Sequence, residues 1–180
     1  MKKKWQEEFL EIAQSLCTKA KKTLKVDVWN ELYGMPIVGN IAGRTYQIEI
    51  DEKRVRQAIK AGLPNIMIGD CRRMPYPESF FDTVLDLLTI GRGYKEYQPV
   101  LYEYARVLKL GGMLAIVYWT ADKEVEQCDK FGGTKQMYFC QTEFEDDLRR
   151  YFETDKLWDF DVSEKNANLV ARAFIGRRKR

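Results

Sequence analysis

Hydrophobic residues recur along this chain in two patterns. Stripes at helical spacing predict helices, which cover residues 5–22, 51–61, 98–108 and 142–152. Shorter apolar runs between them predict strands, which cover residues 24–28, 45–50, 66–68, 80–88, 113–119, 156–162 and 168–176. The pattern has no clear register over 29–43, where residues 37–42 are compatible with the start of a helix, and it loosens again over 121–139.

Strands and helices alternate until the last two strands, which follow one another directly. Such alternation is typical of a parallel sheet with helices on both faces, and the closing pair indicates an antiparallel hairpin at one edge. We therefore expect an α/β fold in which a single domain spans residues 1–180 around a seven-stranded, mostly parallel sheet. It comprises an N-terminal helix (5–22), a core (24–119) and a C-terminal helix with edge strands (142–176).

Several polar and glycine residues stand where helices are expected to begin or end. Asp51 is placed as an N-cap, and Gly62 as the stop of the same helix. Thr142 is expected to cap the last helix, with Glu145 in the capping-box position. The glycine pair 111–112 is expected to end the helix over 98–108, because glycine takes the left-handed turn at little cost.

Composition excludes several classes of protein. The 180 residues are 45% hydrophobic and 32% charged, which is ordinary for one globular domain with a full core. No apolar run approaches the roughly 20 residues of a membrane helix, and the amphipathic N-terminus lacks the apolar stretch of a signal peptide. We expect a cytoplasmic protein.

Cysteine and histidine usage narrows the possible chemistry. The 4 cysteines form no C-x-x-C pair, so we expect free thiols and neither a zinc site nor a disulfide framework. Histidine is absent, which excludes catalysis by Ser-His-Asp or Cys-His groups and any histidine-based metal site. No metal is expected.

Basic residues gather at both ends of a chain whose net charge is only +3. The clusters Lys2–Lys4 and Arg177–Arg180 read most simply as solvated termini. Weak electrostatic contact with RNA is the alternative. The sequence does not indicate an oligomeric state.

The chain is organised around the stretch 65–86, NIMIGDCRRMPYPESFFDTVLD. A short apolar strand ends in Gly69-Asp70, and a second apolar run follows a proline-rich loop. Ligands bind outside the carboxyl ends of strands in open α/β sheets, so Asp70 is expected to face that crevice. Its carboxylate can accept a hydrogen bond from an exocyclic amine such as that of adenine. The alternative is that Asp70 only caps a turn.

Two motifs carry a family resemblance. The segment GDCRRMPYPESFFDTV resembles the pattern GDxxxLPFPDxSFDxV, and RVLKLGG resembles RVLKPGG, with Leu110 in place of proline. Glu49, at the end of the second strand, stands where an acid can hold both hydroxyls of a ribose. Together these residues resemble the class I S-adenosylmethionine-dependent methyltransferases, in particular those with a type-11-like domain. The resemblance is close from about residue 24 to 119, and it implies a Rossmann-like sheet with S-adenosylmethionine as cofactor.

The resemblance also implies a set of binding residues. Glu49 would bind the ribose hydroxyls, Asp70 the adenine amine, and the Cys71 backbone amide a ring nitrogen. Met74 would lie against the adenine face. Residues 86–90 would border the methyl-transfer site. The complete set of implied cofactor residues is Asp27, Gly34, Glu49, Ile50, Asp70, Cys71, Met74 and Asp86.

The first motif departs from the family. Members carry D-x-G-x-G-x-G, whose glycines let the backbone approach the methionine portion of the cofactor. This chain reads DVWNELYG from Asp27 to Gly34, so every expected glycine before Gly34 is replaced. Trp29 then either fills volume that the cofactor needs or turns outward on a different path of the loop.

Two functions of different classes follow. The first is an active methyltransferase with a small-molecule acceptor, whose site would draw on Asp86, Arg92, Tyr94 and Tyr97 unless these are ordinary loop residues. In-line transfer mainly requires positioning of the reactants, so the lack of histidine does not exclude it, and the pattern identifies no catalytic residue. The second is a methyltransferase-like protein that has lost its cofactor and serves as a binding or regulatory partner. A nicotinamide enzyme is disfavoured, because no G-x-G-x-x-G follows the first strand.

Overall fold

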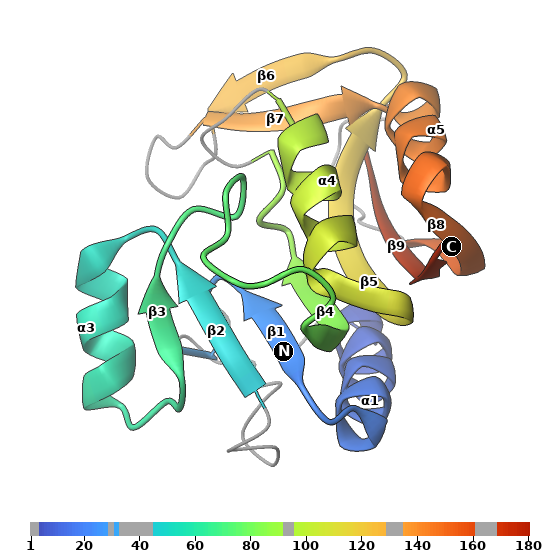
Figure 1. The fold of residues 1–180 in the computed structure, drawn as a ribbon. Coiled ribbons are helices and arrows are strands. Elements are labelled where there is room, and N and C mark those ends of the chain that lie inside the picture. The colour runs from blue at the N-terminus through green and yellow to red at the C-terminus, as the bar shows by residue number, and fades with distance from the viewer. Residues whose placement is uncertain (1–3, 29–30, 33–44, 92–95, 129–134, 161–168) are drawn as a thin grey trace.

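A computed structural model describes residues 4–28, 31–32, 45–91, 96–128, 135–160 and 169–180. Its sheet begins with parallel strands in the order β3 (Ile66–Ile68), β2 (Thr45–Glu49), β1 (Thr23–Val26), β4 (Phe81–Leu87) and β5 (Leu108–Ala121). Along β5 lies β9 (Leu169–Arg178), and β8 (Phe152–Phe160) follows it, both in antiparallel pairing (Figure 1). The predicted α/β class, the seven-stranded sheet and the antiparallel edge pair are confirmed.

A further hairpin was not predicted. Strands β6 (Val125–Cys128) and β7 (Lys135–Cys140) arise from the segment whose pattern loosened, and β7 pairs in parallel with the last two residues of β5. The Met137 amide donates to the Gly91 carbonyl at 3.0 Å, which ties β7 to the loop after β4. The hairpin therefore stands beyond the carboxyl end of β4, where the crevice of such a sheet opens (Figure 1).

The predicted helices are confirmed with shifted ends. They are α1 (Lys4–Lys19), α3 (Glu52–Lys60), α4 (Gln98–Val107) and α5 (Gln141–Tyr151). Asp51 caps α3 as expected, since its carboxylate accepts from the Lys53 and Arg54 amides. No helix in the described part of the chain is both long and apolar enough to cross a membrane.

Two expected helix ends were wrong. Cys140, not Thr142, is the N-cap of α5, and the Glu145 side chain pairs with arginines instead of closing a capping box. Helix α4 ends at Val107, before the glycine pair. Leu108 already pairs with Phe81, so the glycines lie in an irregular stretch of β5, where the register with β4 shifts. A β-carbon at Gly112 would lie 2.8 Å from the Lys109 carbonyl oxygen, so close backbone approach explains this glycine.

Apolar side chains form one cluster on each face of the sheet. On one face α1 packs on β4, β5 and β9, and the cluster contains Phe9, Ala13, Cys17, Leu85, Leu87, Ala115, Val117 and Ala173. On the other face α4 and α5 cover the sheet with a larger cluster that includes Val84, Val100, Leu101, Tyr104, Leu114, Ile116 and Phe144. Burial on both faces accounts for the nearly continuous apolar run of β5.

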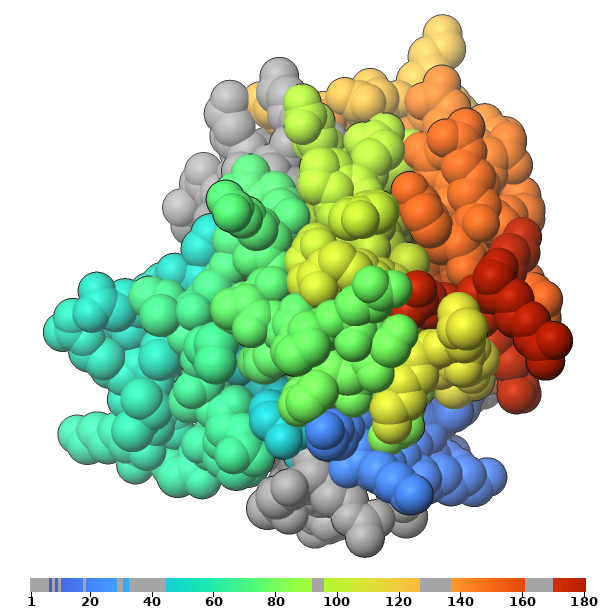
Figure 2. Space-filling view, viewed as in Figure 1, coloured from blue at the N-terminus to red at the C-terminus, as the bar shows by residue number. Residues whose placement is uncertain are grey.

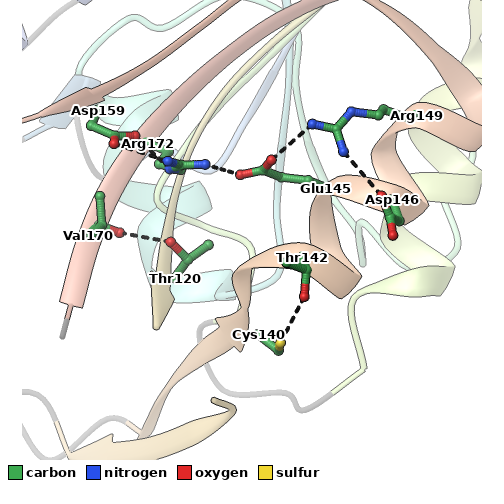
Figure 3. A network of polar contacts seen from close by, with 9 residues as sticks. All are labelled: Thr120, Cys140, Thr142, Glu145, Asp146, Arg149, Asp159, Val170 and Arg172. Carbon is green, nitrogen blue, oxygen red and sulfur yellow. Dashed lines mark hydrogen bonds and ion pairs between the residues drawn. The ribbon is translucent and has the colours of Figure 1, made fainter. Parts of the chain in front are cut away.

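Ion pairs tie α5 to the antiparallel edge. Arg172 on β9 lies between Glu145 of α5 and Asp159 of β8 and pairs with both carboxylates (Figure 3). Arg149, one turn along α5, binds the other side of Glu145 at 3.1 Å. Because Glu145 is buried, these guanidinium groups supply the charge partners that a buried carboxylate requires.

The loop between β3 and β4 is held from α4. Arg106 donates to the carbonyls of Met74 and Tyr76 at 3.0 and 2.9 Å, and its other bonds go to Glu103. Glu103 in turn accepts from the Met74 amide at 2.6 Å. In the space-filling view this loop, coloured green, covers the front of the sheet between α3 and α4 (Figure 2). The pair thus fixes the segment that follows Asp70.

Candidate cofactor-binding site

The carboxyl ends of β1, β2 and β3 lie side by side. The Asp27 amide donates to the Ile48 carbonyl and the Gly69 amide to the Glu49 carbonyl, both at 2.9 Å, so each strand exit is bonded to its neighbour. The chain order reverses between β1 and β4, and ligands of open α/β sheets bind at such a reversal. The implied residues Asp27, Glu49 and Asp70 are therefore brought to one edge.

Glu49 is the most buried acid of this group, with 4% of its surface exposed. One carboxylate oxygen accepts from the Asp51 amide at 2.9 Å and the other from the Val28 amide at 3.4 Å, with Arg54 at 3.6 Å. Burial raises the pKa of Glu49 above its ordinary value, and the nearby Asp27 carboxylate raises it further. A carboxylate has about four acceptor positions, so two amides leave room for ligand hydroxyls.

Asp70 leaves β3 in a turn and is bound by its own neighbour. Its carboxylate accepts from the Arg72 amide at 2.8 Å and from the Arg72 guanidinium at 2.6–3.0 Å. These hydrogen bonds hold the pKa of Asp70 below its ordinary value. The turn-capping alternative is therefore observed, while the carboxylate remains about one-third exposed at the edge of the sheet.

The neighbours of these acids differ in accessibility. The Ile50 side chain is 62% exposed, which is unusual for an isoleucine and offers an apolar surface beside Glu49. Cys71 and Met74 are buried, and Met74 packs in the core cluster beneath the loop. Cys17, Cys71 and Cys140 form no disulfide. Among the described residues no cluster of acids and cysteines could hold a metal ion.

Asp86 lies at the end of β4 with no exposed surface. Its two oxygens accept from the Tyr104 hydroxyl at 2.7 Å and from the Thr89 amide at 2.9 Å, so it joins the β4 exit to α4. Burial raises the pKa of Asp86 above its ordinary value. Both oxygens of Asp86 are thus bonded inside the protein.

The free energy of unfolding is expected to depend on pH through Asp86. Because its folded pKa is raised, folded protein keeps the proton where unfolded protein has lost it, and stability falls as pH rises above roughly 4. Asp86→Asn removes this dependence. In urea unfolding, the free energy of unfolding of the variant should therefore rise relative to that of the native protein as pH increases from about 4 to about 8. Asp82→Asn is the control, because the pKa of Asp82 is shifted in the opposite direction. Partial burial would raise the pKa of Asp82, but the ion pair with Lys109 outweighs it and lowers this pKa. The Asp82→Asn variant should therefore be less stable than the native protein by a constant amount above about pH 4, and this difference should shrink as pH falls below about 4.

Other candidates lie elsewhere. Gly34, Trp29, Arg92 and Tyr94 fall outside the described residues. Tyr97 is buried at the start of α4, donates to Asp147 at 2.9 Å, and lines a groove of about 360 Å³ between α4 and α5. The sequence reasoning missed Lys25, which carries a charge into the middle of β1. A lysine inside an apolar strand run was the signal that could have found it.

Comparison with known proteins identifies a family to which the chain is similar. The sequence profile of a methyltransferase domain matches residues 33–116, which contain the exits of β2, β3 and β4. Over these residues the chain is similar to this methyltransferase family, as its motifs indicated. S-adenosylmethionine is the cofactor that this similarity implies. No curated protein matches the chain in sequence.

Solved structures share the fold of this chain at low sequence identity. The PH0226 protein of Pyrococcus horikoshii OT3 is 16% identical with a TM-score of 0.72, covering 99% of this chain and 92% of its own. A methyltransferase of Methanosarcina mazei is 16% identical (TM-score 0.69, 88% and 92% covered). The Burkholderia thailandensis 1,6-didemethyltoxoflavin-N1-methyltransferase, solved with its substrate and S-adenosylhomocysteine, is 14% identical (TM-score 0.71, 97% and 78% covered). They support the Rossmann-like methyltransferase fold, to which β6 and β7 are added.

The chemistry of the strand exits fits the adenosine part of S-adenosylmethionine. Ribose hydroxyls and the adenine amine are hydrogen-bond donors, and Glu49 and Asp70 present acceptors from adjacent strands. The exposed Ile50 side chain offers an apolar surface next to Glu49 in the chain. These acceptors and this apolar surface therefore fit the adenosine end of the cofactor.

Proposed function

We propose that this methyltransferase holds the adenosine of S-adenosylmethionine at the exits of β2 and β3 and transfers the methyl group to a small-molecule acceptor. The observation that carries the proposal is the pairing of Glu49 with the Gly69-Asp70 turn, joined by the 2.9 Å bond from the Gly69 amide to the Glu49 carbonyl. One acid then reaches the ribose and the other the adenine amine of one ligand.

The remaining implied residues act around these two acids. Ile50 lies along the adenine, the Cys71 amide meets a ring nitrogen, and Met74 supports the loop from below. Asp27, beside Glu49, faces the amino-acid side of the cofactor, while Asp86 supports the exit of β4 through its bond with Tyr104. When bound, the cofactor supplies a methyl group on a positively charged sulfur, and the acids at this edge favour that charge.

A small acceptor is supported by the extra hairpin. β6 and β7 stand beyond the end of β4, and β7 is bonded to the loop after β4, next to which the methyl group would lie. A hairpin there narrows the crevice, which suits a compact molecule better than a long polymer. The toxoflavin relative, which has this fold, acts on a small heterocycle by its name.

A second function is favoured by a specific contact. Arg72 already occupies the Asp70 carboxylate with both its guanidinium and its amide, and the first motif lacks its glycines. In a protein that no longer binds the cofactor these contacts would be permanent, and the sheet would serve as a scaffold for a partner. Binding of the cofactor separates the two functions.

Thermal unfolding with S-adenosylhomocysteine, the demethylated product, tests the proposal. A ligand at 100 times its dissociation constant adds about 2.7 kcal/mol to the free energy of unfolding, which for this size raises the midpoint by about 5 °C or more. We expect such a rise in the native protein and a smaller one in Asp70→Asn. The control Asp155→Asn, which removes a surface acid of β8, should keep the full rise. No rise at millimolar ligand would favour the scaffold function.

A further inference from the structure

Lys25 is a fully buried lysine in the middle of the central strand β1. It stands in register with Gln47 of β2 and Leu85 of β4, on the face that α1 covers. Strands buried on both faces normally carry apolar residues at such positions, because an unpaired buried ammonium is costly. The burial of Lys25 is therefore explained by the groups to which its ammonium donates hydrogen bonds.

The Lys25 ammonium bonds the backbone at the exit of β1. It donates to the Val26 carbonyl at 2.7 Å and to the Asp27 carbonyl at 2.8 Å. In a trans peptide the carbonyl and the amide of the same unit point in opposite directions. The unit whose carbonyl is that of Asp27 therefore directs the Val28 amide away from Lys25, and this amide donates to the Glu49 carboxylate at 3.4 Å.

The exit of β1 also has an unusual conformation. Asp27 has φ of 65°, a left-handed value that glycine adopts freely and other residues rarely do. Aspartate tolerates this region better than most residues, but unlike glycine it adopts it at a cost. The two bonds from Lys25 hold the carbonyls on both sides of the Asp27 α-carbon and thereby stabilise it.

We propose that Lys25 is a positioning residue of the cofactor site, which fixes the exit of β1 and orients the Val28 amide toward Glu49. The proposal rests on the proposed function for its effect on the cofactor, since Glu49 is the ribose-binding acid. Its structural part, the link from Lys25 through one peptide to Glu49, stands without any ligand.

The test begins without ligand. In ¹⁵N-labelled native protein, the Val28 amide signal is expected to shift with pH as Glu49 titrates, because the two are hydrogen-bonded. In Lys25→Met this shift should fall by at least about half, since the peptide is no longer held. Asp27 and Asp51 also face Glu49, as does Arg54 of α3, and they are unchanged in every variant. Gln47→Leu is the matched control: it removes a buried polar side chain in register with Lys25, and the Val28 shift should remain.

Calorimetric titration with S-adenosylhomocysteine then measures the consequence. We expect Lys25→Met to weaken binding about tenfold and Gln47→Leu less than twofold. If Lys25→Met does not fold, Lys25→Gln, which keeps one short neutral donor, replaces it in both measurements. A Val28 signal that follows Glu49 equally well in the Lys25 variant overturns the inference. Native protein that shows the Val28 coupling but binds no ligand overturns the proposed function and leaves the positioning link intact.

Discussion

Arg106→Ala is expected to lower the free energy of unfolding by about 3 kcal/mol, because it leaves a buried carboxylate without its cation. Glu103 is nearly buried on α4 and forms bonds of 2.6 and 2.8 Å with the Arg106 guanidinium. The same guanidinium binds the carbonyls of Met74 and Tyr76, so the variant also frees the loop after Asp70. Chemical unfolding in urea at neutral pH measures the loss.

Two further variants show whether the buried charge is the cause. Arg56→Ala removes an arginine of a similar ion pair, with Glu52 on α3, but both side chains are more than half exposed. Its cost should stay below about 0.5 kcal/mol. Adding Glu103→Gln to Arg106→Ala should recover part of the loss, since the amide is cheaper to bury than the lone carboxylate. A loss for Arg106→Ala as small as that for Arg56→Ala would contradict this role.

Glu49→Gln is expected to weaken S-adenosylhomocysteine binding about 100-fold, since a charged acceptor for two ribose hydroxyls is replaced by a neutral amide. The amide group would also turn one donor toward the amides of Val28 or Asp51, which are donors themselves. Folding should suffer less than binding, because removing a charge that is costly to bury offsets this unfavourable contact between donors. Calorimetry for binding and urea unfolding for stability measure the two effects separately.

The control for this variant is Glu52→Gln, which changes the neighbouring acid on the exposed surface of α3. Its binding constant should match that of the native protein within about twofold. Equal binding by Glu49→Gln and native protein would show that the β2 exit does not hold the ribose.

Much of the sheet could be predicted from the sequence, because a strand buried on both faces, such as β5, carries a nearly continuous run of apolar residues. The run IMI also predicted the observed bounds of β3, although this edge strand is largely exposed, and the acid after it was expected at the strand exit where Asp70 lies. The Asp51 cap was also predictable, since a short acid before a helical stripe has one common use.

Other features depend on contacts between distant segments, which a local pattern does not contain. The hairpin of β6 and β7 is stabilised by pairing with β5 and by the Met137–Gly91 bond, while its own residues show no clear alternation. The glycine pair 111–112 was expected to end α4, but the close approach of the Lys109 and Asp82 carbonyls explains Gly112. Lys25 likewise has a role only once the exits of β1 and β2 are seen together.

A crystal structure of the protein with S-adenosylhomocysteine tests the central claim most directly. We expect the Glu49 carboxylate within hydrogen-bonding distance of both ribose hydroxyls, and the adenine amine on Asp70 with Arg72 turned aside. Ligand bound elsewhere, with Glu49 still bonded only to Val28 and Asp51 and with Arg72 still on Asp70, would contradict the account.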